Sequence, residues 1–97
     1  MEQLQEALRK FSEERGWTGN RDARNLAISI SLEASELLEH FQWQSPEEAV
    51  AARRDEIAEE AADVLIYLVQ FADALNIDLL EAARAKMAKN AERFPIG

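Results

Sequence analysis

The chain has 97 residues, of which 47% are hydrophobic and 31% are charged, and this balance predicts one compact domain over residues 1–97. Acidic residues outnumber Lys and Arg by 19 to 11, so a surface of net charge -8 should repel nucleic-acid polymers. The absence of Cys excludes disulfides, thiolate zinc sites and cysteine nucleophiles. Because residues 1–10 lack the apolar core of a signal peptide and the chain has no apolar run of about 20 residues, we expect a cytoplasmic protein without a membrane partner.

Helical periodicity predicts the first two elements. Residues 2–15 place Leu4, Leu8 and Phe11 on one face of a helix, and Gly16 and Gly19 follow as helix breakers. A second helix is predicted over 24–41. Its stretch 26–32 alternates apolar and polar residues as a strand does, but the chain has no second strand-like run to pair with it, which favours the helix.

Capping patterns predict where the remaining helices begin. Ser45, Pro46 and Glu48 are typical of a helix start, and a break near Arg53 would leave a short extra helix at 46–52 before a long helix over 54–75. Asp78 with Glu81 predicts a last helix over 79–93. The expected fold is therefore all-α, with four main helices in an antiparallel bundle. A core this small favours assembly as a dimer or a dimer of dimers.

Two pairs of carboxylates interrupt apolar helix segments. Residues 61–72 are apolar on nearly every side of the helix, so Asp63 is expected in a desolvated place with Glu60 one turn earlier. Glu33 and Glu36 interrupt the second helix in the same way. Oxygen ligands without Cys suit Mg²⁺ or Mn²⁺ far better than Zn²⁺.

The spacing of these pairs is also compatible with a solvated helix face. In a chain this rich in Glu, a Glu-x-x-Glu spacing arises by chance about twice, and most such pairs are exposed helix charge. Only their placement within apolar segments distinguishes the two pairs. The residue pattern alone therefore leaves both interpretations open.

Further candidate residues lie on the last helix and at the loops. Lys86, Asn90 and Arg93 share one face, which suits either the dipole at a helix C-terminus or a phosphate ligand. The two tryptophans, Trp17 and Trp43, suit either peripheral packing or stacking on a base. Tyr67, one turn after Asp63, is expected to reach the same cavity, whereas His40 is expected at the surface rather than as a base.

Together these motifs resemble the all-α MazG-like nucleoside triphosphate pyrophosphohydrolases, and most closely the dCTP pyrophosphatase branch. The signature E-x-x-E followed by E-x-x-D is present as Glu33 and Glu36, then Glu60 and Asp63. The resemblance spans almost the whole chain, through the segments FSEERGW (11–17), RNL (24–26), EASELLEHFQW (33–43), EEAADVLIYLV (59–69) and KMAKNAERFP (86–95).

The resemblance implies a function and roles for these residues. The four carboxylates would hold Mg²⁺, with Glu33 or Glu36 orienting or deprotonating the attacking water. Cleavage between the α and β phosphates would release a monophosphate and pyrophosphate, as housecleaning of dCTP-like or non-standard pyrimidine nucleotides. Sites at subunit boundaries of a dimer or tetramer would hold the nucleotide. Its contacts would be Lys86, Asn90 and Arg93 for phosphate and sugar, and Trp43, Tyr67 and Trp17 nearer the base.

Some positions depart from the family pattern. Arg21 and Ala23 stand where relatives often have His and Pro, and Phe94 stands where Tyr is common. These departures leave the base and sugar preference open. The competing hypothesis is a non-catalytic module that binds nucleotides or a partner helix.

Overall fold

The computed structural model describes residues 1–17 and 22–96, and this part of the chain is helical with no strand. Its four helices are α1 (Glu2–Glu14), α2 (Ala23–Glu39), α3 (Pro46–Ala74) and α4 (Leu79–Arg93). The expected all-α class is thereby confirmed, including the helix over 26–32. The expectations that concern Gly19 and Arg21 lie outside the described residues.

The helix starts follow the capping patterns. The side chain of Ser45 accepts a hydrogen bond from the amide of Glu48 at 3.2 Å, and that of Asp78 accepts one from the amide of Glu81 at 3.0 Å. Each bond satisfies an amide that has no partner within the first turn of its helix. A further cap at Asp22, which the sequence analysis did not identify, accepts from the Asn25 amide at 2.7 Å.

The expected break in the third helix is present as a kink. Arg53 has φ -140 and ψ 36, so the segment before it joins the longer helix at an angle instead of standing apart. The short extra helix at 46–52 and the long helix over 54–75 are thus two arms of α3. Asn76, with φ 55, turns the chain after α3, in a conformation that Asn tolerates better than most residues.

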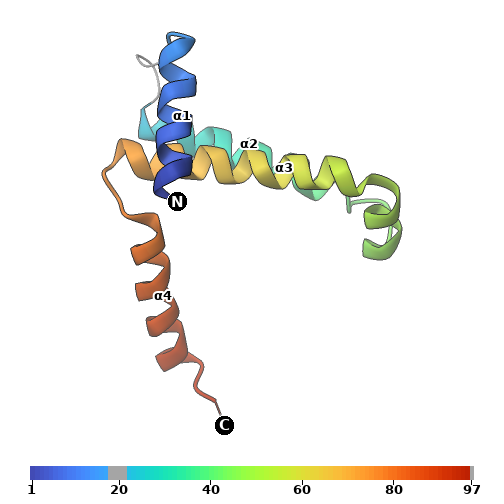
Figure 1. Cartoon of the computed structure of the whole chain (residues 1–97). Helices are drawn as coiled ribbons and strands as arrows, with labels where there is room; N and C mark the ends of the chain where they lie inside the picture. Colours follow the sequence, from blue (N-terminus) through green and yellow to red (C-terminus); the bar gives the residue numbers. More distant parts are fainter. Residues whose placement is uncertain (18–21, 97) are drawn as a thin grey trace.

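Most of the packing lies between α2 and α3, which run antiparallel side by side, and α1 crosses α3 (Figure 1). The side chains that are fully buried within one chain are few and come from α2 and both arms of α3: Leu26, Ala49, Val69 and Ala72. This pair of helices is the scaffold on which the acidic residues lie.

The expected antiparallel bundle of four helices is formed only in part within a single chain. α4 extends away from the other helices, and all its residues from Leu80 onward are exposed (Figure 1). The radius of gyration is 16.3 Å, whereas a compact chain of this length has about 12.5 Å. Among the described helices the antiparallel arrangement holds for α2 and α3, whereas α1 crosses α3 and α4 extends away (Figure 1).

Residues 61–72 are likewise not buried on every side. Val69 and Ala72 are buried, but Leu65 is 42% exposed and Ala61 and Ala62 are exposed. One chain therefore covers only one face of this apolar helix. Exposed apolar surface of this kind is typical of a face that another subunit covers.

Within the described residues, none of the helices has a stretch that is both apolar enough and long enough to cross a membrane.

Candidate functional site

Three carboxylates from α2 and α3 converge at the middle of the antiparallel pair. Glu33 and Glu36 lie one turn apart on α2, and Glu60 lies on the facing side of α3. Each contributes a carboxylate oxygen, and these three oxygens lie within 4.8 Å of one another. We refer to Glu33, Glu36 and Glu60 as the acidic cluster. The i, i+3 spacing on α2 brings two of its members together, and helix packing adds the third.

The cluster is partly withdrawn from water. Glu33 and Glu60 are half-buried and Glu36 is exposed. One oxygen of each half-buried residue, Oε2, is buried without a hydrogen-bond partner in the described part of the protein. Because a buried charged oxygen without a partner is costly, the arrangement is one that a cation would stabilise.

The pKa values of Glu33 and Glu60 are raised, as expected for carboxylates that are close together and partly buried. Burial raises the pKa of Glu33 to about 7, and the neighbouring carboxylates of Glu36 and Asp63 raise it as well. Burial also raises the pKa of Glu60, with the negative charge of Glu36 as the next cause. Without a cation, then, Glu33 retains its proton to higher pH than an ordinary glutamate does.

Asp63, the fourth predicted ligand, stands beside the acidic cluster but outside it. It is half-buried one turn after Glu60 on α3, and its charge contributes to the raised pKa values of both Glu33 and Glu60. Its carboxylate is not part of the group of oxygens within 4.8 Å of one another. The structure thus brings three of the four predicted ligands together and places the fourth next to them.

A surface hollow of about 530 Å³ opens next to the cluster. Its lining comes from the end of α2, the α2–α3 connection and α3: Glu36, Glu39, His40, Gln42, Trp43, Arg53 and Glu60. Trp43 shares this hollow with two cluster residues, and its side chain is 85% exposed. A flat, solvated indole beside carboxylates is suited to stacking on a ring of a bound ligand. His40 is half-buried at the end of α2.

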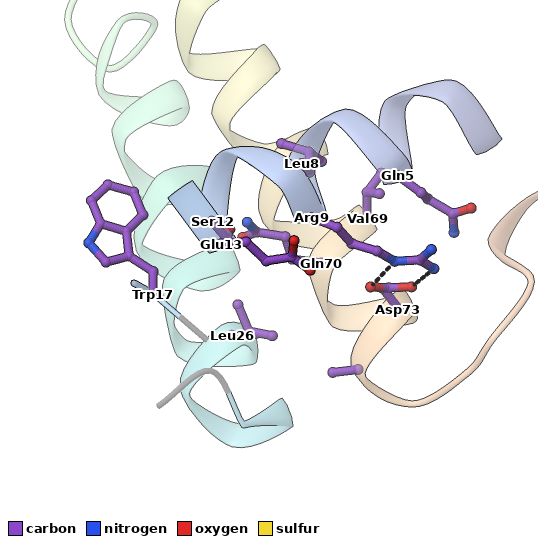
Figure 2. A pocket seen from close by; sticks show the side chains of 11 residues that line it. Gln5, Leu8, Arg9, Ser12, Glu13, Trp17, Leu26, Val69, Gln70 and Asp73 are labelled. Atoms are coloured by element: carbon purple, nitrogen blue, oxygen red, sulfur yellow. Dashed lines mark hydrogen bonds and ion pairs between the residues drawn. The ribbon is translucent and has the colours of Figure 1, made fainter. Parts of the chain in front are cut away.

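The other two predicted aromatic contacts lie elsewhere on the scaffold. Tyr67 is half-buried on α3, one turn after Asp63. Trp17 lines a separate pocket of about 220 Å³ together with Leu26 and the Arg9–Asp73 ion pair (Figure 2). Trp17 also packs edge-on against Phe11, with ring centroids 5.8 Å apart. Within one chain, Trp17 and Trp43 therefore line different cavities.

The predicted phosphate contacts are not brought to the acidic cluster of their own chain. Lys86, Asn90 and Arg93 are exposed on α4, which extends away from α2 and α3 (Figure 1). The guanidinium of Arg93 lies 5.4 Å from the ring centroid of Phe94. These side chains are presented to solvent, or to another molecule.

Arg53 is among the residues of the hollow that the sequence analysis missed. Arg53 was noted only as a place where the helix breaks, yet its side chain lines the hollow with Glu36 and Glu60. The predicted helix break at Arg53 was the signal in the sequence that could have identified this residue. A side chain at a kink need not follow the face that helical periodicity assigns to it.

Comparison with known proteins gives consistent matches. A model of the MazG-like family matches residues 28–97. The chain is 36% identical to dCTP pyrophosphatase 1 of Mus musculus and 35% identical to that of Homo sapiens, over 99% and 98% of its own length. It spans 59% of the length of each of these two relatives.

A solved structure is similar over the whole fold. A pyrophosphatase from Archaeoglobus fulgidus superposes with a TM-score of 0.93 at 45% identity, covering 99% of this chain and 93% of that one. Both chains therefore share one arrangement of helices, including an α4 that departs from the α2–α3 pair.

Proposed function

Because this chain belongs to the MazG-like family, we propose that it is a metal-dependent nucleotide pyrophosphohydrolase. The reaction cleaves the bond between the α and β phosphates of a nucleoside triphosphate and releases a monophosphate and pyrophosphate. The names of the relatives favour a pyrimidine deoxynucleotide such as dCTP, removed as housecleaning. The observation that carries this proposal is the convergence of Glu33, Glu36 and Glu60 with two buried oxygens that lack partners.

These residues suit a hard divalent cation. Their donors are carboxylate oxygens only, which Mg²⁺ prefers and which Mn²⁺ also accepts. We assign Glu33, Glu36 and Glu60 as ligands, with Asp63 beside them as the fourth. When bound, the ion supplies positive charge that attracts a polyphosphate to an acidic protein and lowers the pKa of water.

We assign the orientation or deprotonation of the attacking water to carboxylates of this chain. Glu33 or Glu36 orients that water or accepts its proton, a role that a carboxylate within reach of the water can perform. Trp43 stacks on the base from the rim of the hollow, and Tyr67 and Trp17 are assigned nearer the nucleoside. The remaining contacts, to the phosphates and the sugar, are assigned to Lys86, Asn90 and Arg93.

The position of α4 supports a second copy of the chain as the source of those contacts. Its cationic face is exposed and distant from the acidic cluster of its own chain (Figure 1). Leu65, 42% exposed, and Met87, 70% exposed, leave apolar surface for a partner to cover. We therefore propose that residues 1–97 form one domain, and that a dimer or a dimer of dimers completes both the core and the site.

Pyrophosphate release tests the proposal. The protein is incubated with a panel of deoxynucleoside and ribonucleoside triphosphates with Mg²⁺, and with chelator as a control. We expect Mg²⁺-dependent pyrophosphate release, fastest for a pyrimidine deoxynucleotide. Release from none of the panel would contradict the proposal, and Mg²⁺-dependent binding without product would indicate a non-catalytic nucleotide-binding protein.

A further inference from the structure

Arg53 joins the two ends of the connection between α2 and α3. Its Nη2 donates to the side-chain Oε1 of Gln44 at 2.8 Å and to the carbonyl oxygen of His40 at 3.4 Å. His40 ends α2, and Gln44 immediately precedes Ser45, the N-cap of α3. A single guanidinium therefore contacts both ends of the segment 40–44.

This segment has few other means of holding its shape. Its backbone bonds are short-range, from the amide of Phe41 to the carbonyl of Leu38 at 2.9 Å and from Gln42 to Glu39 at 3.3 Å. The carbonyl of His40 lies where a helix ends, a position at which carbonyls lack helical partners and attract cations. Trp43, between the two contacts of Arg53, is 85% exposed, so its own packing does little to fix it.

The guanidinium of Arg53 hydrogen-bonds to the α2–α3 connection and not to the carboxylates near it. Arg53 lines the same hollow as Glu36 and Glu60, yet in the part of the chain that the structure describes it forms no ion pair with them. Its Nε is buried and has no hydrogen-bond partner there. Burying an N–H donor without a hydrogen-bond partner is unfavourable, and an exposed arginine would avoid that cost by extending into water. The bonds from Nη2 to His40 and Gln44 therefore hold the side chain where it is.

From these contacts we propose that Arg53 is a positioning residue that holds the segment 40–44, and with it the indole of Trp43, at the rim of the acidic hollow. Arg53 lies at the kink of α3, and from there its side chain reaches the end of α2 and the residue before the N-cap of α3. For the reaction, Arg53 thereby sets how well the nucleoside end of a substrate is held. That consequence rests on the proposed function, whereas the placement of Trp43 does not.

Fluorescence tests the placement of Trp43 without any turnover. In a Trp17→Phe background, Trp43 is the only tryptophan, and its anisotropy decay reports local motion of the indole. We expect Arg53→Gln to increase the amplitude of fast motion, and Gln44→Ala to do so to a smaller extent. Arg54→Gln is the matched control, because Arg54 is exposed and does not line the hollow. The proposal is overturned if Arg53→Gln and Gln44→Ala both leave the decay like that of Arg54→Gln.

Kinetics tests the consequence for substrate, with Trp17 retained. Arg53→Gln is expected to raise KM about tenfold with kcat changed by less than about threefold, since it loosens a ground-state contact. Arg53→Lys should recover part of the loss, because an ammonium retains one donor to the connection. A fall in kcat at unchanged KM would overturn the assignment.

If the unaltered protein releases no pyrophosphate, the proposed function fails, and the fluorescence result alone decides the placement. If Arg53→Gln does not fold, Gln44→Ala takes its place in both tests, because Gln44 is exposed.

Discussion

Glu33 on α2 and Glu60 on α3 face each other across the helix pair, each with a buried carboxylate oxygen that lacks a hydrogen-bond partner in the described residues. Burial is the largest cause of the raised pKa of each. Two such groups destabilise the metal-free fold and at the same time prepare it for a divalent cation. Stability, metal binding and pH dependence are therefore linked at this contact.

Replacing Glu60 with Gln should separate metal binding from folding. Without metal, Glu60→Gln is expected to melt a few degrees above the unaltered protein, because the substitution removes one of several repelling carboxylates. Mg²⁺ at a hundred times its Kd should add about 2.7 kcal/mol to the unaltered protein and little to Glu60→Gln. Thermal unfolding with chelator and with Mg²⁺ measures both effects. Glu59→Gln, at the exposed neighbouring position, should keep the full gain. An equal gain from Mg²⁺ in Glu60→Gln would contradict the assignment of Glu60.

The metal-free protein should lose stability as pH rises towards neutrality. The pKa of Glu33 is raised from its ordinary value of 4.5 to about 7. Between these values the folded chain keeps a proton that the unfolded chain has released, so the free energy of unfolding falls with pH. Unfolding in chelator across this range should show the decline, and Glu33→Gln should flatten it. Stability that rises over the same range in the unaltered protein would contradict the raised pKa.

The ion pair between Arg9 and Asp73 should contribute a small, salt-dependent part of stability. It joins α1 to the end of α3, and the Arg9 guanidinium lowers the pKa of Asp73 (Figure 2). Its contribution is present above the ordinary pKa of Asp and is lost as pH falls through the lowered value. Arg9→Ala should lower the melting temperature by a few degrees at low salt and by less at high salt. Lys10→Ala on the same helix is the control. A loss that high salt leaves undiminished would indicate that Arg9 acts through packing instead.

Mixing two inactive variants should restore activity if α4 serves the site of another copy. Glu33→Gln removes a cluster carboxylate, and Arg93→Ala removes an exposed cation of α4, the helix that extends away from α2 and α3 (Figure 1). In randomly mixed dimers, half of the molecules contain both variants, and one of their two sites is intact. Activity should therefore return to about a quarter of that of the unaltered protein after the subunits exchange. No recovery, with exchange verified by mass spectrometry, would contradict a shared site.

Local features of the chain could be predicted closely from the residues alone. Ser45 and Asp78 cap helices where expected, the kink falls at Arg53, and the helices end within two residues of the expected bounds. Glu33 and Glu36 were identified as a candidate pair because they interrupt an apolar segment. Such features depend on side chains within a turn of one another, so the information lies in short stretches of sequence.

Contacts between distant residues were decided by the tertiary structure. The oxygens of Glu33, Glu36 and Glu60 meet because α2 and α3 pack antiparallel in one register, a register that also leaves Asp63 to one side. Arg53, at the kink of α3, contacts Gln44, nine residues earlier in the chain. The position of α4, away from the other helices, is likewise visible only in the tertiary structure (Figure 1). Periodicity in the sequence identifies the apolar face of each helix, but it does not identify the helix that packs against that face. The energy of helix pairing is spread over many weak contacts between segments far apart in the chain.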